Sequence, residues 1–322
     1  MIDIDALNIL ADNIDRHAFR RGYVSAFTLT AFPTETDEEL SIHVTRESEG
    51  LVYGNAEVGT ADAFKACIDA LDGKVDFIVY DIDLQFEIIR PDNTMICPMS
   101  KSVLLAYRDL DVWVSSVKYT MLSLVKNLKH KKCVLVNSAK CHSGLGEMLR
   151  DGIKGIVAEL AVIDSDENNS GVFSVADIII GGAVYTPVIE KNHVIECGDD
   201  TLIVDAGIGT ITTEASDFAR QKGMKILRVD NRAAMAGTLI SIIQSHDLVN
   251  RVMGEGEIDG VPVVAGGIIG APGTVIVDSI HQPSEVIGIA DGTGKVRYKP
   301  SNDIERERIE KVRNWILDNG NG

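Results

Sequence analysis

The chain has 322 residues, of which 45% are hydrophobic and 25% charged, and its formal net charge is −17. This length is enough for two domains, and the composition is that of a globular protein with sizeable buried cores. Nucleic acids and anionic membrane surfaces attract cations, so the negative charge argues against both partners. It does not exclude a small anionic ligand held by local backbone amides.

The five cysteines are an odd number and include no C-x-x-C pair. We therefore expect a reduced, cytoplasmic protein without disulfides. The acidic start, MIDIDALNILADN, lacks a basic segment, so we predict no signal peptide. None of the seven histidines is spaced as a zinc motif, and we predict no metal site.

The first hundred residues alternate between helical and strand patterns, which indicates an α/β domain over residues 1–112. Thr60 stands where it would cap the second helix. The predicted elements are a helix at 5–20, a strand at 23–32, a helix at 60–71 and a strand at 75–83.

Short apolar runs separated by helical patterns continue beyond a long predicted helix at 114–128. Such alternation is typical of a doubly wound, mostly parallel sheet, and we assign it to residues 130–300. The run at 155–164 fits a strand or a helix. A charged helix at 301–322 ends the chain and could pack back onto the first domain. The predicted strands are 133–138, 176–182, 201–207, 224–230 and 285–291, and the predicted helices between them include 213–222 and 232–245.

One segment has the hydropathy of a membrane span. Residues 261–280 hold a single charge, but they also contain two prolines and four glycines. That composition favours a buried strand, a glycine-rich loop and a second buried segment over a span.

The stretch VLVNSAKCHSGLG, residues 134–146, leads from a strand into a helix. It lacks the early glycines of a dinucleotide-binding turn, where a Cβ blocks the approach of the pyrophosphate. The amides of a helix N-terminus can still hold an anion. We therefore predict a phosphate site formed by Ser138, Lys140, Ser143 and Gly144, with a plain strand-to-helix turn as the alternative.

Asp164 follows Gly144 by 20 residues, at the end of the run 155–164. An acidic side chain in this place can accept the ribose hydroxyls of NAD and would repel the 2′-phosphate of NADP. The alternative is that Asp164 only begins a solvated acidic loop.

Residues 175–209 carry the clearest pattern. Ala176-Asp177 and three isoleucines precede Gly181 and Gly182, and Ile203-Val204-Asp205-Ala206-Gly207 follows downstream. This order resembles the methylene-tetrahydrofolate dehydrogenases and, more broadly, the amino-acid-dehydrogenase-like Rossmann domains of shikimate dehydrogenase and the pyrrolysine-biosynthesis dehydrogenase. The resemblance covers about residues 130–210.

The resemblance implies a Rossmann-like fold and an NAD or NADP cofactor. It implies that Gly181, Gly182 and Ala183 line the cofactor and that Gly207 and Gly209 lie near the nicotinamide. The tetrahydrofolate signatures of the first domain are not recognisable, which argues against folate as the substrate.

The first domain offers catalytic candidates. TMICPMSKS, residues 94–102, loosely resembles the lysine signature of shikimate dehydrogenases, which implies a catalytic Lys101. Asp81 and Asp83 end a predicted strand, where open α/β sheets face the ligand. They could orient Lys101 or hold a substrate amine, and Asp83 is the second acid–base candidate. A solvated strand end is an equal alternative, and a Mg²⁺ site is a third.

Arg232 follows the predicted strand 224–230. Its guanidinium fork suits a substrate carboxylate or phosphate. A surface salt bridge is the alternative.

These observations predict an NAD(P)-dependent oxidoreductase with a small polar substrate between a smaller N-terminal α/β domain and a Rossmann-like domain. A homo-oligomer is compatible with them. The missing glycine turn leaves two alternatives open: a non-redox enzyme such as an S-adenosylmethionine-dependent transferase, and a binding protein without catalysis.

Overall fold

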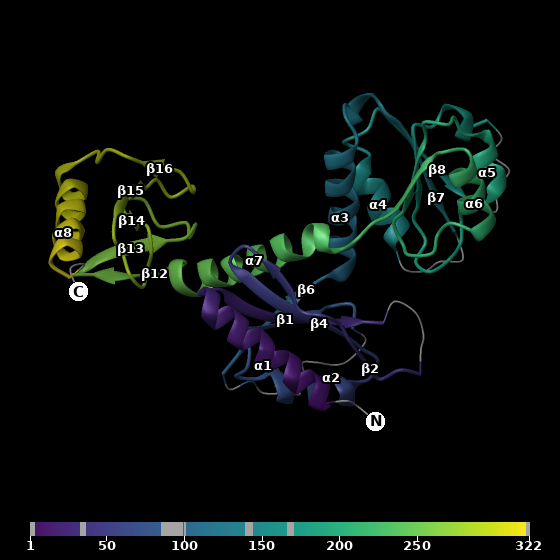
Figure 1. Ribbon diagram of the computed structural model, residues 1–322. Coiled ribbons are helices and arrows are strands. Elements are labelled where there is room, and N and C mark those ends of the chain that lie inside the picture. Colours follow the sequence, from purple (N-terminus) through teal and green to yellow (C-terminus); the bar gives the residue numbers. More distant parts are fainter. Residues whose placement is uncertain are drawn as a thin grey trace. The chain divides into compact units, whose positions relative to one another are not determined.

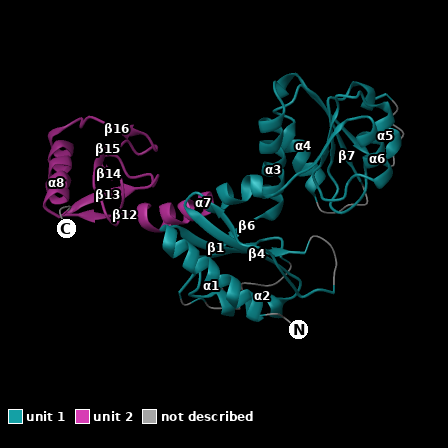
Figure 2. Ribbon diagram, in the orientation of Figure 1, with its two compact units in different colours: residues 1–239 teal, residues 240–322 magenta. Residues whose placement is uncertain are grey.

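The computed structural model describes residues 4–32, 37–84, 99, 101–138, 144–165 and 171–319. Three β-sheets are formed within these ranges (Figure 1). The chain divides into two compact units, residues 1–239 and 240–322 (Figure 2). The first two sheets belong to the first unit and the third sheet to the second.

The first sheet has the strand order β2-β4-β1-β5-β6, with β3 also paired to β4, and its strands β4, β1, β5 and β6 run parallel. Helices α1 and α2 cover one face through a core that includes Leu7, Ile14, Phe27 and Ile68. Thr60 caps α2 as predicted, because its side chain accepts a hydrogen bond from an amide of the first turn. The elements are α1 (Ile4–Arg21), β1 (Val24–Ala31), β2 (Leu40–Ile42), β3 (Arg46–Ser48), β4 (Leu51–Val58), α2 (Ala61–Leu71), β5 (Phe77–Asp81) and β6 (Val103–Tyr107).

The second sheet is fully parallel, with the order β11-β10-β9-β7-β8. The ambiguous run 155–164 supplies its edge strand β8. Helices α3 and α4 pack on one face, and α5 and α6 pack on the other (Figure 1). The elements are α3 (Asp109–Leu124), η1 (Leu128–His130), β7 (Lys132–Asn137), α4 (Leu145–Ile153), β8 (Glu159–Asp164), η2 (Phe173–Val175), β9 (Ile178–Gly181), α5 (Lys191–Glu196), β10 (Leu202–Asp205), α6 (Thr213–Gln221) and β11 (Lys225–Arg228).

The third sheet is mainly antiparallel, except that β13 and β14 run parallel. Ile309, Val312 and Ile316 of α8 join its core. The remaining elements are α7 (Arg232–Asp247), η3 (Leu248–Val252), β12 (Gly254–Ile258), β13 (Val261–Ala265), β14 (Val275–Val277), β15 (Val286–Ala290), β16 (Val296–Arg297) and α8 (Asp303–Asn319).

This third sheet corrects one expectation. The strand predicted at 285–291 is β15, which pairs antiparallel outside the doubly wound sheet, so that sheet does not extend to residue 300. Within the second unit, the C-terminal helix packs on β13, β14 and β15. A short apolar run has the same composition in a parallel and an antiparallel sheet, so the pattern could not separate the two.

The apolar segment 261–280 forms β13, a glycine-containing loop and β14, as predicted. In the described part of the chain, no helix combines the length and the apolar composition needed to cross a membrane.

A partly buried ion pair joins α8 to β16. Two nitrogens of Arg297 donate to Glu305 at 2.6 and 3.1 Å, and the Ser301 amide donates to it at 2.7 Å. The Arg297 hydrogen bonds hold the pKa of Glu305 at about 2, below its ordinary 4.5. The ionised carboxylate therefore stabilises the fold above pH 4.5, and this contribution disappears as the pH falls toward 2.

We expect Glu305→Gln to destabilise α8 by about 2 kcal/mol at pH 7, the scale of hydrogen bonds to charged groups. Amide hydrogen exchange of α8 measures this loss. The exposed Glu310→Gln is the matched control. Equal protection of α8 in both variants would contradict the assignment.

Candidate functional site

The order of the second sheet reverses at β7. The chain places β8 on one side of β7 and then crosses to place β9 on the other. In open α/β sheets the crevice at such a switch point, outside the carboxyl ends of the strands, is the usual ligand site. In this sheet the corresponding position is the carboxyl edge that follows Asn137 of β7 and Gly181 of β9.

Asp164 lies at the same carboxyl edge of the sheet. It is the last residue of β8 and the register partner of Asn137, the last residue of β7. The Ser165 amide donates to the Asn137 carbonyl at 2.9 Å and continues the pairing by one residue. Asp164, which was predicted to bind a ribose, therefore ends the strand next to β7, where the strand order reverses. A carboxylate that binds the ribose of a dinucleotide occupies this position in such sheets.

The turn after β7 is described only in part, because Lys140 and Ser143 lie outside the described residues. Ser138 is buried, and Gly144 begins α4 with a left-handed φ of 72°. A Cβ on Gly146 would overlap the side chain of Asn137. Gly146 thus permits close packing of α4 on β7, and the phosphate role of the turn stays a prediction.

The small residues after β9 and β10 are explained by packing within the domain. A Cβ at Gly181 would overlap the Thr210 hydroxyl, and one at Gly207 would overlap the Ala183 carbonyl. At Gly182 a Cβ would lie 2.9 Å from Leu135. Packing alone therefore explains why these positions are glycine, and their lack of a side chain is no evidence that a cofactor approaches closely. Cofactor contacts at these positions stay predictions.

Gly209 differs from these glycines. Its φ is 78°, and no atom lies within 4 Å of a Cβ built there, so it is open. Asp205, the last residue of β10, fixes the loop around it. The carboxylate accepts the Gly209 amide at 2.7 Å and the Thr210 hydroxyl at 2.8 Å. Sequence reasoning used Asp205 as part of a motif and missed this role.

Two residues with a strained backbone conformation lie at the same edge. Tyr185 has φ of 49° and Ile208 has φ of 62°, a region that bulky side chains rarely adopt. The Tyr185 amide donates to the Gly207 carbonyl at 2.9 Å, which joins the two strained loops. Strained residues that the surrounding structure holds in place concentrate at functional sites. This cluster therefore marks the carboxyl ends of β9 and β10 as a candidate site.

The first sheet has a polar carboxyl edge as well. Asp81 ends β5 and is buried, and its carboxylate accepts the amides of Asp83 at 3.1 Å and of Asp109 at 3.2 Å. Burial raises the pKa of Asp81. The carboxylate thus joins the end of β5 to the start of α3.

Asp109, the first residue of α3, is the acid–base candidate that sequence reasoning missed. Its carboxylate accepts Trp113 Nε1 at 2.9 Å and the Tyr107 hydroxyl at 3.4 Å. Burial, followed by the charge of Asp81, raises the pKa of Asp109 to about 6. A carboxyl group that titrates near neutrality is suited to proton transfer. Asp109 follows the strand that ends at Tyr107, and that strand-end position was the available signal.

The structure separates Lys101 from the aspartates that were expected to orient it. Lys101 is exposed at the amino end of β6, whereas Asp81 and Asp83 lie at the carboxyl end of β5. The strands are parallel, so about 20 Å of strand separates Lys101 from Asp83. Asp83 instead accepts Arg108 Nε at 3.0 Å. The Lys101–Asp83 pairing is therefore wrong, because sequence order gives no indication of which sheet edge a residue occupies.

Arg232 forms the surface salt bridge that was its alternative reading. Its Nε donates to Asp230 at 2.6 Å, and the guanidinium is exposed. Arg46 Nη1 lies 3.8 Å from the same carboxylate. Asp230 is thus the partner of the Arg232 guanidinium, which was predicted to bind substrate.

Glu57, near the end of β4, connects the two polar edges electrostatically. Its charge contributes to the raised pKa of Asp109, after burial and Asp81, and to that of Tyr185, after burial. The charge of Glu57 therefore acts on one group near the carboxyl edge of the first sheet, Asp109, and on one near that of the second, Tyr185. Among the described residues, no three His, Cys, Asp or Glu side chains gather as a metal site.

No family model matches the sequence, and no curated protein matches it. Among solved structures, the chain is similar to the FolD methylenetetrahydrofolate dehydrogenase/cyclohydrolase of Campylobacter jejuni. The identity is 11%, the match covers 76% of this chain and 96% of the other, and the TM-score is 0.40. The chain is also similar to the Trypanosoma brucei FolD, complexed with NADP cofactor and inhibitor. The identity is 12%, the match covers 76% of this chain and 95% of the other, and the TM-score is 0.42.

A chorismate mutase/shikimate 5-dehydrogenase fusion protein from Clostridium acetobutylicum is also similar. Its identity is 12%, the match covers 70% of this chain and 97% of the other, and the TM-score is 0.37. Two of the three dehydrogenase types that residues 175–209 resemble, the methylene-tetrahydrofolate and the shikimate dehydrogenases, are thus among the similar structures. At these TM-scores we draw no inference about cofactor or substrate from them.

We expect Asp109→Asn to stabilise the protein at pH 7. The raised pKa means that the folded state holds a proton between about pH 4 and pH 6 that the unfolded chain releases, so stability falls as the pH rises through this range. The variant removes this cost, and for a half-buried group we expect a gain of about 1–2 kcal/mol at pH 7 and none at pH 3.

Urea unfolding at both pH values measures the effect. Asp111→Asn, an exposed carboxylate in the same helical turn, is the control. A loss of stability in Asp109→Asn at pH 7 would show that Asp109 is ionised and favourably paired.

Proposed function

We propose that the chain binds a nicotinamide dinucleotide at the crevice beyond β7 and β9 and acts as an oxidoreductase on a small polar metabolite. The observation that carries the proposal is the place of Asp164, at the end of the strand beside the switch point. A carboxylate there suits the ribose hydroxyls of NAD and disfavours the 2′-phosphate of NADP.

The strained loops support the same assignment. Tyr185 is 44% exposed, and Gly209 is open, so the edge formed by the β9 and β10 loops presents accessible groups next to the crevice. Asp205 holds that edge rigid through its hydrogen bonds to the loop. Rigid, preorganised loops place a ligand precisely and reduce the entropy cost of binding it.

Asp109 supplies the proton chemistry of the proposal. When bound, the nicotinamide would accept or donate the hydride. In the oxidation of an alcohol, the ionised Asp109 accepts the hydroxyl proton, and in the reduction of a carbonyl the protonated form returns it. Trp113 and Tyr107 hold the carboxylate in one orientation. The proposal replaces Lys101 with Asp109 as the acid–base group.

A second function is supported by the turn after β7. It lacks the early glycines, and the Asn137 side chain fills the space beside Gly146. S-adenosylmethionine has a ribose that Asp164 could hold but no pyrophosphate, so a transferase fits this turn as well. The remaining parts of the proposal are predictions: a cytoplasmic protein, free of nucleic-acid and membrane partners, that could form homo-oligomers.

We expect calorimetry to show that NADH binds more tightly than NADPH. Asp164→Ala should weaken NADH about tenfold, the loss expected when a pair of hydrogen bonds to a charged group is removed, and should reduce the preference over NADPH.

Glu159→Ala is the matched control, because it removes an exposed carboxylate from the opposite end of the same strand. Tight S-adenosylmethionine binding without NADH binding would favour the transferase. Absence of binding by all three ligands at millimolar concentration would overturn both functions.

A further inference from the structure

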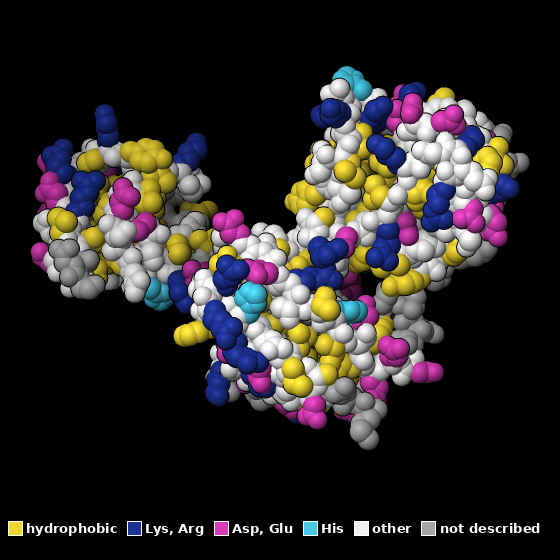
Figure 3. Space-filling model, in the orientation of Figure 1, with side chains coloured by type: hydrophobic (Ala, Val, Ile, Leu, Met, Phe, Trp, Pro, Cys, Tyr) yellow, Lys and Arg dark blue, Asp and Glu magenta, His cyan; other side chains and the backbone are white. Residues whose placement is uncertain are grey.

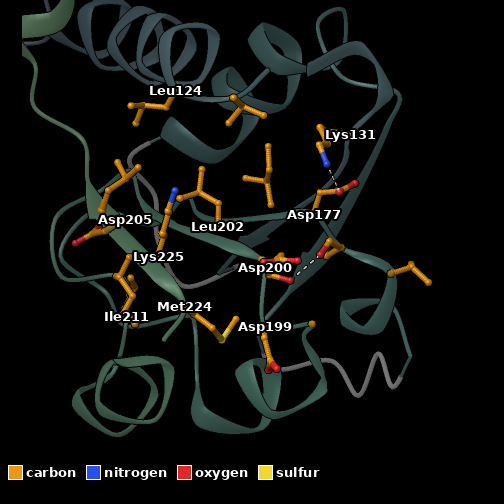
Figure 4. A pocket seen from close by; sticks show the side chains of 18 of the residues that line it. Leu124, Lys131, Asp177, Asp199, Asp200, Leu202, Asp205, Ile211, Met224 and Lys225 are labelled. Atoms are coloured by element: carbon orange, nitrogen blue, oxygen red, sulfur yellow. Dashed lines mark hydrogen bonds and ion pairs between the residues drawn. The ribbon is translucent and has the colours of Figure 1, made fainter. Parts of the chain in front are cut away.

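The carboxyl edge of the second sheet is marked by its backbone conformation and not by its surface charge. Acidic and basic side chains are interspersed on the domain that contains this sheet, on the face seen in Figure 3. The groove beside β10 and β11 takes its lining from both faces of the sheet and from its amino edge, and it holds aspartates as well as lysines and arginines (Figure 4). Neither feature selects one kind of ligand, whereas the strained residues after β9 and β10 do.

Four residues other than glycine adopt a left-handed backbone conformation in the described part of the chain. Asn127 and Asp259 are two of them, and short polar side chains of this kind adopt that conformation most readily. The other two are Tyr185, with φ of 49°, and Ile208, with φ of 62°. For bulky or β-branched side chains the conformation is an outlier that persists only where the surrounding structure holds it. Both outliers follow neighbouring strands, β9 and β10.

The hydrogen bond that holds Tyr185 involves its backbone alone. Its amide donates to the Gly207 carbonyl at 2.9 Å. The loop of Gly207 is fixed in turn by the carboxylate of Asp205, at the end of β10 (Figure 4). A glycine at position 185 has the same amide and could adopt the same φ without a steric cost. The local fold therefore requires the backbone of residue 185 but not a tyrosine side chain.

The side chain of Tyr185 contributes little to the packing of the domain. It is 44% exposed and belongs to none of the hydrophobic cores of the described residues. Its hydroxyl forms no hydrogen bond with any residue that the structure describes. An aromatic ring that brings backbone strain, yet joins neither a core nor a hydrogen bond, is expected where the ring contacts a ligand.

Tyr185 lies across the switch point from Asp164. The strands β8, β7, β9 and β10 are successive neighbours, and Tyr185 follows β9 and is hydrogen-bonded to the loop after β10. Strands β9 and β10 are two and three strand spacings from β8, about 10 and 14 Å. A dinucleotide lies across the crevice at a switch point, so one whose adenosine ribose is held by Asp164 extends its nicotinamide towards β9 and β10. This placement rests on the function proposed above.

The charges around Tyr185 favour a cation. Burial raises the pKa of the Tyr185 hydroxyl. Of the nearby charges, that of Glu57 has the largest effect and raises the pKa further, Arg228 lowers it, and Asp205 raises it. The surroundings of the side chain are therefore negative on balance, and the face of a tyrosine ring itself attracts cations. The nicotinamide ring is a cation when oxidised and neutral when reduced, so both effects favour the oxidised form.

We propose that the ring of Tyr185 stacks on the nicotinamide ring of the dinucleotide and favours its oxidised, cationic form. Tyr185 is then a positioning residue for hydride transfer, because stacking holds the nicotinamide in one orientation. The backbone strain at Tyr185 is the cost of presenting an aromatic ring from a loop that the hydrogen bonds after β9 and β10 hold in place.

Calorimetry with the full chain and three ligands tests the proposal. NAD⁺ and NADH carry the nicotinamide ring, whereas ADP-ribose has the same adenosine, pyrophosphate and second ribose without it. Tyr185→Leu keeps an apolar side chain but removes the aromatic ring. We expect this variant to weaken NAD⁺ about tenfold and NADH about threefold, since the cation adds to the stacking only in NAD⁺. The affinity for ADP-ribose should change by less than about twofold, because this ligand has no ring to stack there.

Two further substitutions at position 185 assign the effect to the ring. Tyr185→Phe keeps the ring and should keep the native affinities to within about twofold. Tyr185→Gly adopts the backbone conformation without strain and should lose NAD⁺ affinity as Tyr185→Leu does. Tyr119→Leu, at a tyrosine of α3 that is 50% exposed, is the matched control and should change no affinity. Circular dichroism checks that each variant is folded.

Unchanged NAD⁺ affinity in Tyr185→Leu would overturn the stacking proposal, as would an equal loss of NAD⁺ and ADP-ribose affinity or a loss in Tyr185→Phe as large as in Tyr185→Leu. An equal loss for NAD⁺ and NADH would overturn the preference for the oxidised form. Each of these results leaves the proposed function in place, because the native chain still binds NAD⁺. If the native chain binds neither NAD⁺ nor ADP-ribose, the proposed function fails, and the stacking proposal fails with it.

Discussion

The reversal of strand order at β7 is the constraint on which the account depends. In a parallel sheet all carboxyl ends lie at one edge, and at a reversal of strand order this edge is where open α/β sheets bind ligands. Asp164 and Gly181 lie at this edge because each is the last residue of its strand. The same edge holds the strained Tyr185 and Ile208, whose conformations the loop hydrogen bonds of Asp205 help to maintain.

The proposed proton chemistry depends on the other sheet of the first unit. Asp81 ties the end of β5 to the start of α3, and α3 begins with Asp109. The position that suits Asp109 to proton transfer also lowers the stability of the fold when Asp109 is ionised, because burial and the adjacent carboxylate of Asp81 disfavour its charge. Such a conflict between stability and charge is expected where a group is held for chemistry rather than for folding.

The sequence predicted several elements of the first unit, because short apolar runs, helical periodicity and the Thr60 cap are local signals, but it missed strands β2, β3, β4 and β6. It left the run that ends at Asp164 open between a strand and a helix, and the structure shows that Asp164 ends strand β8. It could not place Lys101 and Asp83, since the edge that a side chain occupies depends on strand direction and pairing. It missed Asp109 because the predicted helix began at residue 114 rather than at Asp109, and only the approach of Asp81, Tyr107 and Trp113 makes this aspartate distinctive. The separate third sheet escaped detection because apolar runs do not reveal strand direction.

Hydrogen exchange with and without NADH tests the central claim, dinucleotide binding at the switch point, most directly. The account predicts added protection in the peptides that contain Asp164 and residues 181–183, at the ends of β8 and β9. It predicts no change in residues 254–297, which form a separate sheet. Protection confined to residues away from the carboxyl ends of β7, β8 and β9, or none at saturating NADH, would contradict the assignment of the site.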